Sequence, residues 1–285
     1  MRESKRVIKF RAEMINTLPK FPNSRETKEA LEYMPLATLL IHYLNWVSRY
    51  VSVRARKVII EPVVTADHRW KLLNKQIKHF LEKVSRGENL APNMSLQPHS
   101  KGYSPATSAQ VKGVDRWADK DFLLNTMGFY HFHLGTVLEE KGYANRTNDV
   151  LFARITREEF IVVGIFDHSV FDIAGELMSE ERKRLWDIFD MHTCRSVQSG
   201  SVVVSSLIAT SGHPVHVVFT ASKYARVIRE LDSNLDNPVF LKGLYDGVHK
   251  DVPRNAKLEW TLDYSDLCIY EKKHRHRFLL YRGFN

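Results

Sequence analysis

A pair of strand-like runs joined by a short polar segment restricts the fold of this chain more than any other feature. Asp149–Ile155 and residues 160–166 are both rich in Val, Ile and Phe. Four polar residues, 156–159, separate the two runs. Two strand-forming runs with so short a connection are typical of an antiparallel hairpin. The sequence therefore predicts an antiparallel sheet in this part of the chain.

The first hundred residues show a helical pattern instead. Apolar residues recur three and four positions apart between residues 35 and 51, which predicts one helix there. Asp67 is a suitable N-cap for a second helix, which Gly87 would end. Residues 87–112 contain several prolines and few apolar residues, so we interpret them as a long loop and a candidate domain boundary.

We therefore predict an α+β fold in two parts. Residues 1–112 would form a mostly helical N-terminal region that ends in a flexible loop, and residues 113–285 an antiparallel-sheet domain with flanking helices. Beyond the hairpin, strands are expected at 128–134, 202–208, 215–219, 258–262, 267–271 and 278–281, and helices near 121–125, 179–191, 221–231 and 238–245.

The charge of the chain suggests a polyanionic partner. The 285 residues include 42 Lys and Arg against 33 Asp and Glu, a formal net charge of +9. Such a surplus attracts RNA, DNA or acidic surfaces. A solvated basic surface without any partner is the alternative interpretation.

Cysteine usage and hydropathy indicate where the protein would work. Cys194 and Cys268 are the only cysteines and have no CxxC spacing, so neither a disulfide framework nor a cysteine zinc site is expected. The first residues lack the apolar run of a secretory signal. No segment approaches the ~18 continuous apolar residues that span a bilayer. We expect a cytoplasmic protein without a membrane partner.

The segment Tyr130-His131-Phe132-His133-Leu134-Gly135 is the most informative for function. In a strand, His131 and His133 project from one face, while Tyr130, Phe132 and Leu134 project from the other. The later strand at 160–166 leads into Asp167 and His168. If the two strands lie side by side, the three histidines converge.

Two imidazoles suit acid–base cleavage of RNA. One would remove the proton of the ribose 2′-OH, and the other would protonate the departing 5′-oxygen, because free imidazole titrates near about 6.5. Arg146 or Arg154 would stabilise the extra negative charge on the phosphorus oxygens. This chemistry needs no cofactor.

Two other interpretations stay open for the same residues. In the first, His131 and His133 bind a divalent metal together with Asp167 or His168, and the metal activates water for phosphodiester hydrolysis. In the second, the imidazoles are structural, and the protein is a non-enzymatic module that binds nucleic acid or a partner protein.

Two basic segments are candidate contacts for a phosphate backbone. The first lies between strands near the C-terminus and comprises Lys272, Lys273, Arg275 and Arg277. The second comprises Arg54, Arg56 and Lys57. A hairpin turn of solvated charges is the alternative for the first segment, and a helix end whose cations complement the macrodipole is the alternative for the second.

Residues 122–168 resemble the central sheet of the RelE/ParE-like bacterial toxins. The resemblance is carried by the runs at 129–134, 148–154 and 162–168, in which a strand with polar groups precedes two apolar strands, one beside an Arg and one ending in a polar residue. The HxHxG strand is also similar to uncharacterised proteins of mobile elements. The resemblance implies an endoribonuclease of toxin or phage-defence type, with RNA as substrate and an antitoxin or regulatory protein as partner. It makes His131 or His133, Arg154 and His168 the active positions.

Overall fold

The chain folds into two compact units, each built from segments far apart in the sequence. The computed structural model describes residues 3–105, 117–174, 177–195, 197–198, 200–201, 207–248 and 252–284. Unit 1 is formed by Met1–Ser48, Gln97–Lys120 and Ala209–Phe284. Unit 2 is formed by Arg49–Leu96 and Asp121–Ile208.

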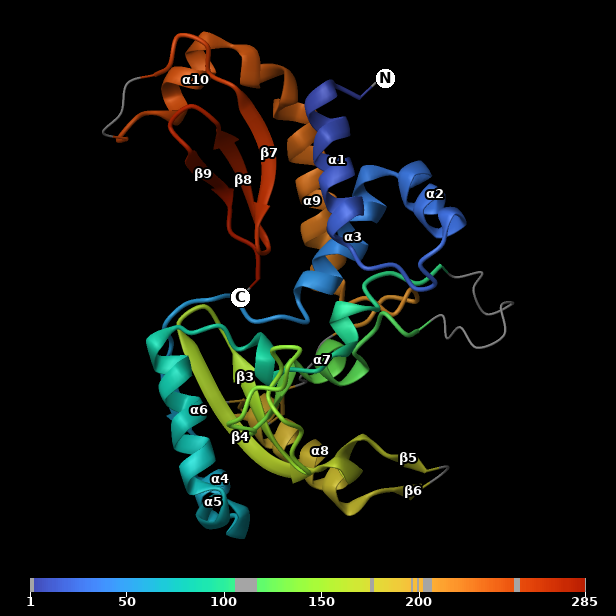
Figure 1. Ribbon diagram of the computed structural model, residues 1–285, viewed down its shortest axis with the longest axis vertical. Coiled ribbons are helices and arrows are strands. Elements are labelled where there is room, and N and C mark those ends of the chain that lie inside the picture. Colours follow the sequence, from blue (N-terminus) through green and yellow to red (C-terminus); the bar gives the residue numbers. More distant parts are fainter. Residues whose placement is uncertain are drawn as a thin grey trace. The chain divides into compact units, whose positions relative to one another are not determined.

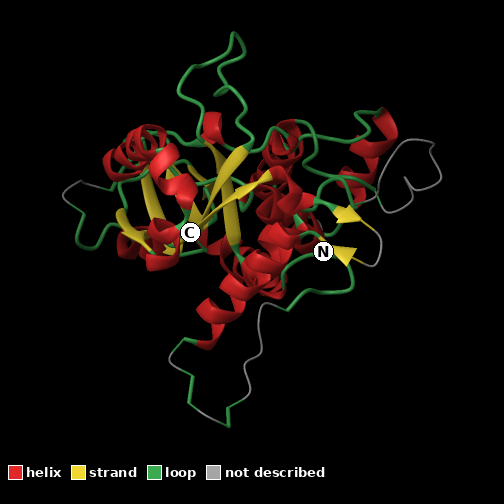
Figure 2. Cartoon of the chain, turned by 90° about the horizontal axis from the view of Figure 1, so that it is seen from below, coloured by secondary structure: helices red, strands yellow, loops and turns green. Residues whose placement is uncertain are grey.

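The predicted division into residues 1–112 and 113–285 therefore does not match the compact units. Helix α3 (Leu36–Val47) packs against α9 (Val215–Leu231) in unit 1, and strand β1 (Lys57–Ile60) pairs with β4 (Glu159–Asp167) in unit 2. Each pairing buries apolar residues against a partner that is distant in sequence, which a change in local composition does not reveal. The α+β class itself is confirmed, with more helix than strand (Figure 2).

Unit 1 packs helices against a three-stranded antiparallel sheet in the order β7-β8-β9. The strands closely follow the predicted segments. The elements of this unit are α1 (Lys5–Thr17), α2 (Arg25–Tyr33), α3, η2 (Gln97–His99), α9, η5 (Asp232–Asp236), α10 (Pro238–Leu244), β7 (Leu258–Asp263), β8 (Asp266–Glu271) and β9 (His276–Tyr281).

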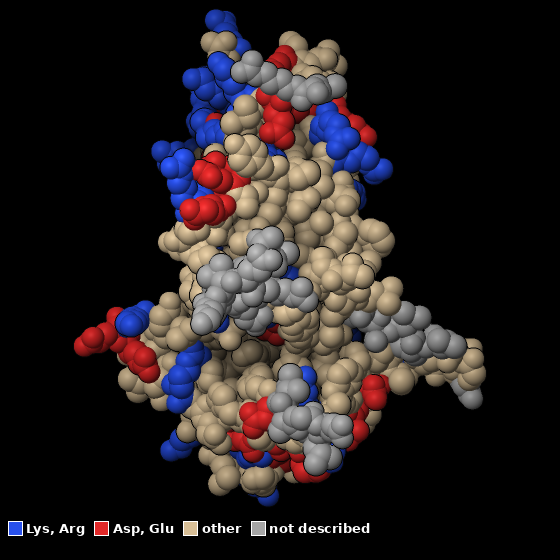
Figure 3. Space-filling model, turned by 90° about the vertical axis from the view of Figure 1, so that its right-hand side faces the viewer, with Lys and Arg blue, Asp and Glu red and all other residues tan. Residues whose placement is uncertain are grey.

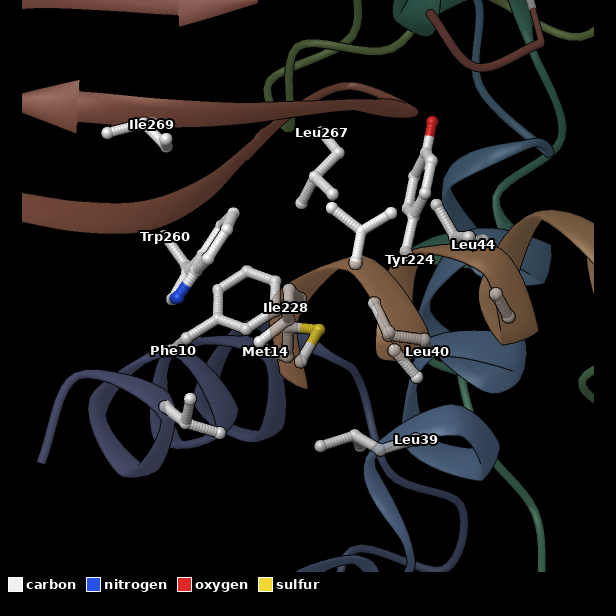
Figure 4. Packing of buried hydrophobic residues seen from close by; sticks show 14 of the residues in the cluster. Phe10, Met14, Leu39, Leu40, Leu44, Tyr224, Ile228, Trp260, Leu267 and Ile269 are labelled. Carbon is white, nitrogen blue, oxygen red and sulfur yellow. The ribbon is translucent and has the colours of Figure 1, made fainter. Parts of the chain in front are cut away.

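The core of unit 1 lies between its sheet and α1, α3 and α9. Figure 4 shows Trp260 of the sheet beside Phe10 of α1, and Leu40 of α3 near Tyr224 of α9. Two buried polar atoms in this core have partners: Trp260 Nε1 donates to Asp232, and the Tyr224 hydroxyl donates to the Ser265 carbonyl. The polar atoms that these two aromatic side chains carry into the core therefore have hydrogen-bond partners.

The predicted strand at 215–219 is wrong, because these residues begin helix α9. Their β-branched character favours a strand locally. In the fold, Val217 lies on the same helical face as Ala221 and Tyr224, and all three are buried. Tertiary packing of that face outweighs the local preference. The predicted strand at 202–208 falls largely on residues outside the described ranges.

Unit 2 contains a four-stranded sheet in the order β1-β4-β3-β2. Strands β2 (Phe129–His133), β3 (Asp149–Ile155) and β4 are antiparallel neighbours, as the hairpin pattern predicts, and β1 adds a parallel edge strand. The remaining elements of the unit are α4 (Pro62–Ala66), α5 (His68–Leu72), α6 (Asn74–Arg86), η1 (Ala91–Asn93), α7 (Phe122–Met127), η4 (His168–Phe171), β5 (Ile173–Ala174), β6 (Leu177–Met178) and α8 (Glu180–Cys194).

Helices cover both faces of this sheet, with α6 and α8 on opposite sides of β3 and β4 (Figure 1). Asp67 begins α5, and Gly87 ends α6 in the left-handed conformation, so both expected caps are present. The single helix predicted between them is wrong, because Leu73 divides it into α5 and α6. Asp121 likewise caps α7, which begins the segment that leads into β2. Gly128 ends α7 in the left-handed conformation, and β2 starts at the next residue.

Candidate functional site

Strand β2 presents His131 and His133 from one face of the sheet. Tyr130 and Phe132 belong to the core that α6 covers, whereas Phe129 belongs to the core on the α8 side. Because side chains alternate along a strand, His131 and His133 share the α8 side with Phe129. The sequence-based expectation that the two imidazoles face the same way agrees with this geometry.

His168 joins them from the end of β4. The register pairs His133 with Val150 at the start of β3, and Asp149 with Asp167 at the end of β4. The end of β2, the start of β3 and the end of β4 therefore lie at the same end of the sheet. Helix η4 then turns the His168 ring onto His133, with the two ring centroids 5.4 Å apart and an interplanar angle of 29°. We call His131, His133 and His168 the histidine cluster.

The orientation of the exposed His168 ring is determined by a backbone carbonyl. Its Nδ1 lies 2.7 Å from the Asn148 oxygen. A carbonyl oxygen can only accept, so Nδ1 must carry the hydrogen and donate it. When the ring is neutral, Nε2 therefore holds the lone pair, and when the ring is charged, Nε2 holds the mobile proton.

His133 is nearly enclosed. The residue is 6% exposed, and within the described part of the chain its Nδ1 atom is buried without a hydrogen-bond partner. Burial lowers the pKa of His133 to about 4, and the positive charge of Arg146 and the two neighbouring imidazoles contribute to the same shift. Near neutral pH the ring is therefore uncharged.

His131 is set among phenyl rings. Its ring centroid lies 4.9 Å from that of Phe171 and 5.8 Å from that of Phe152. Burial lowers the pKa of His131, and the Asp121 carboxylate partly opposes this effect. Of the three imidazoles, His168 is the most open to solvent and His131 has the most apolar surroundings.

Arg146 and Arg154, both predicted to bind a phosphate, lie at different places. Arg146 donates to the Met94 carbonyl at 2.9 Å, and its charge acts on His131 and His133. Arg154 of β3 pairs with Phe129, at the opposite end of β2 from His133. At about 3.3 Å per residue, Phe129 and His133 lie roughly 13 Å apart along the strand. The charge of Arg154 acts instead on His192 of α8. Arg146 therefore accompanies the histidine cluster, and Arg154 does not.

Gly135 allows the segment with Arg146 to approach the end of β2, a role that was not assigned to it from the sequence. A Cβ atom at position 135 would overlap the backbone and side-chain oxygens of Asn145. Asn145 is tied to the same loop, because its backbone N–H donates to the Val137 carbonyl and its Oδ1 accepts from the Val137 N–H. The glycine of the HxHxG pattern is visible in the sequence, but only the contact with Asn145 shows why a side chain is excluded there.

The alternative metal set of His131, His133, Asp167 and His168 is not gathered around one point. Asp167 Oδ1 accepts hydrogen bonds from the backbone N–H and the hydroxyl of Ser169, and Oδ2 lies 3.4 Å from Arg69. Within the described ranges, the one group of three or more His, Cys, Asp or Glu whose donor atoms all lie within 4.8 Å of one another is elsewhere, in unit 1.

The predicted basic patch of Arg54, Arg56 and Lys57 is not a uniform contact surface. Arg56 is 4% exposed, and its guanidinium donates to the carbonyls of Ser52 and Thr156. It therefore holds two backbone segments together and is not available to a phosphate. Lys57 is exposed at the start of β1.

The basic segment near the C-terminus, with Lys272, Lys273, Arg275 and Arg277, forms the turn between β8 and β9. Lys272 pairs with Glu259, and Arg277 pairs with Asp263. Lys273 and Arg275 are exposed. On the face seen in Figure 3, Asp and Glu side chains likewise lie among the Lys and Arg side chains. The net positive charge of this turn is therefore smaller than its sequence suggests.

No protein-family model, curated protein or solved structure matches this chain. Among the described residues, no helix has both the length and the apolar character needed to cross a bilayer.

Proposed function

We propose that this protein is a metal-independent ribonuclease whose reacting groups lie in the histidine cluster. The observation that carries the proposal is the stacking of His133 on His168 beside the charge of Arg146. Their ring centroids are 5.4 Å apart, which is close enough for both imidazoles to serve one phosphodiester. RNA is the proposed partner. The toxin or phage-defence role and the antitoxin partner that the resemblance implies are the finer part of the same proposal.

His133 is suited to act as the general base. Its pKa of about 4 leaves the ring neutral at cellular pH. The ring is nearly enclosed, so RNA must open the site before His133 accepts the proton of the ribose 2′-OH. His168 is suited to act as the general acid, because it is exposed and its Nε2 is not tied to the Asn148 carbonyl. A bound phosphodiester anion favours the charged form of an imidazole beside it.

The reaction balances without a cofactor. The 2′-oxygen forms a bond to phosphorus as its proton passes to His133, and the bond from phosphorus to the 5′-oxygen breaks as His168 donates a proton. The products are a 2′,3′-cyclic phosphate and a free 5′-hydroxyl. Arg146 would stabilise the negative charge that accumulates on the phosphorus oxygens. His131 packs against the rings of Phe152 and Phe171, so it has no reacting role in this scheme.

The donor geometry favours this route over the metal-dependent one. Asp167, the carboxylate of the alternative metal set, is held by Ser169 and Arg69. The neutral His133 fits both routes, so the contrast between them comes from Asp167 and not from the imidazoles.

The test is cleavage of an end-labelled RNA by the full chain, with and without EDTA. We expect cleavage that survives EDTA, leaves cyclic phosphate ends, and stops where the 2′-OH is replaced by hydrogen. His133→Ala and His168→Ala should each reduce the rate at least about a hundredfold. His79→Ala, at an exposed position of α6 in the same unit, is the matched control.

Three results would contradict the proposal. The first is loss of cleavage in EDTA with recovery on adding a divalent metal. The second is equal cleavage by His133→Ala and the wild type. The third is salt-sensitive RNA binding without turnover, unchanged in His133→Ala, which identifies a non-enzymatic binding module.

A further inference from the structure

Three polar residues from separate segments meet inside unit 1. His42 lies on α3, Asp119 lies in the turn at residues 117–119, and His213 lies in the turn before α9. One ligand atom of each residue lies within 4.8 Å of those of the other two. None of the three belongs to the histidine cluster, so the chemistry of this group is independent of the proposed ribonuclease activity.

Both imidazoles of this group contain a buried nitrogen atom. His213 is 3% exposed, and its Nε2 is buried without a hydrogen-bond partner in the described part of the molecule. The same holds for Nδ1 of His42. Buried polar atoms are rarely left in this state, because they lose their hydrogen bonds to water and gain nothing. Two imidazoles that each hold such a nitrogen, grouped with one carboxylate, are the donor groups that a cation requires.

We propose that His42, Asp119 and His213 bind a divalent transition-metal ion of the zinc class. Two imidazole nitrogens and one carboxylate oxygen form a ligand set that suits Zn²⁺, and three protein ligands leave a fourth position for water or a substrate. Ligands about 2.0–2.2 Å from a tetrahedral ion lie roughly 3.5 Å from one another. The ligand atoms of the three residues now lie within 4.8 Å of one another, so small rotations of the side chains would bring them to these distances.

The surroundings already orient the donors. His213 Nδ1 lies 3.0 Å from the Ser211 hydroxyl, and with Nδ1 donating to that oxygen, Nε2 carries the lone pair. Gly212 permits the close approach of the two turns, because a Cβ at this position of positive φ would meet the Trp117 ring. The Ser104 backbone N–H donates to the Asp119 carboxylate. The turns with Asp119 and His213 are thus held against each other before any ion binds.

Both imidazoles are in the protonation state that a metal needs. Burial lowers the pKa of His42 to about 3 and that of His213 to about 2, and the charge of Lys120 adds to both shifts. Burial also raises the pKa of Asp119, because water no longer stabilises the charged carboxylate. A nearby cation favours the charged form instead.

Lys120 is the competitor for this site. Its Nζ lies 2.7 Å from Asp119 Oδ2, and both side chains are buried. The ammonium group provides the positive charge that the carboxylate needs when no metal is bound. A divalent ion would repel it, so metal binding must displace the ammonium or remove its proton. Replacing Lys120 by a neutral side chain should therefore strengthen metal binding.

The experiment is Zn²⁺ binding by the full chain after removal of metals with EDTA. Titration calorimetry and elemental analysis should give one Zn²⁺ per chain, and Co²⁺ in its place should give the visible spectrum of a low-symmetry nitrogen and oxygen site. His42→Ala and His213→Ala should each weaken binding at least about a hundredfold, and Ser211→Ala about tenfold. Lys120→Met should tighten binding, a gain that a folding defect cannot imitate.

Two controls keep the assignment specific. His216→Ala, at an exposed histidine near the start of α9, should bind Zn²⁺ as the wild type does. His133→Ala should also retain the ion, which separates this site from the proposed ribonuclease. Zn²⁺ binding that is equal in the wild type and His213→Ala, or weaker in Lys120→Met, would overturn the proposal and identify the group as a buried ion pair with two structural histidines.

Discussion

The ring of His133, the last residue of β2, stacks on the ring of His168, the first residue of η4, with centroids 5.4 Å apart. One ring is nearly enclosed, and the other is exposed and held by a carbonyl at its Nδ1. The pair therefore places an imidazole of low pKa beside one that solvent reaches. Such an asymmetric pair fits one proton acceptor and one proton donor.

The burial of His133 should make the fold sensitive to acid. Its pKa is about 4 in the folded chain and near about 6.5 in the unfolded chain. Between these values the unfolded state binds a proton that the folded state does not, so stability rises with pH and is lost as the pH falls from about 6.5 towards 4. From pH 6.5 to 5 this group should cost about 2 kcal/mol of unfolding free energy. Urea unfolding at both pH values checks this, and His133→Gln should show a correspondingly smaller loss. Equal losses in both proteins would contradict the assigned burial.

Gly135→Ala should impair RNA cleavage without touching a reacting group. The added methyl group must push the Asn145 backbone away, and Arg146 moves with it. A displacement of this kind should lower the cleavage rate roughly ten- to a hundredfold and the stability by about 1–3 kcal/mol. Gly243→Ala is the matched control, because a Cβ there meets nothing within 4 Å. Cleavage kinetics and thermal unfolding of both variants decide the matter, and full activity in Gly135→Ala would exclude the steric role.

Arg56→Met should destabilise the fold and not act through nucleic acid. The substitution keeps an apolar stem but leaves the Ser52 and Thr156 carbonyls without their charged donor. The unfolding free energy should fall by about 3 kcal/mol. Lys57→Met, at the exposed neighbouring position, should change it by less than about 0.5 kcal/mol. Denaturant unfolding of the two variants measures the difference, and a stable Arg56→Met protein with weakened RNA binding would reverse this interpretation.

Lys273 and Arg275 are the side chains of the β8–β9 turn that can still contact a phosphate backbone. If both do, the double variant Lys273→Gln with Arg275→Gln should reduce the slope of log K against log salt by about 1.4, at roughly 0.7 per contact for single-stranded RNA. Binding titrations over a range of salt concentrations measure this slope. Lys71→Gln with Lys75→Gln removes the same charge from exposed positions of α5 and α6 and serves as the control. Identical slopes in both double variants would exclude the turn from the RNA contact.

Much of the local structure follows from the sequence. The hairpin of β3 and β4, the caps at Asp67 and Gly87, and the alternation that puts His131 and His133 on one face all depend on residues close together in the chain. Hydrophobic period, capping chemistry and turn length act within a few residues, so they can be read directly.

Tertiary structure alone decided the rest. The pairing of β1 with β4, the burial of Arg56 and the start of α9 at Val215 depend on which distant surfaces become buried together. The same is true of His42, Asp119 and His213, which have no shared motif in the sequence and meet only when three segments pack. A charge is satisfied, a strand is paired and an imidazole is neutral only when a segment distant in sequence packs against it. The residues around each position do not show which distant segment that will be.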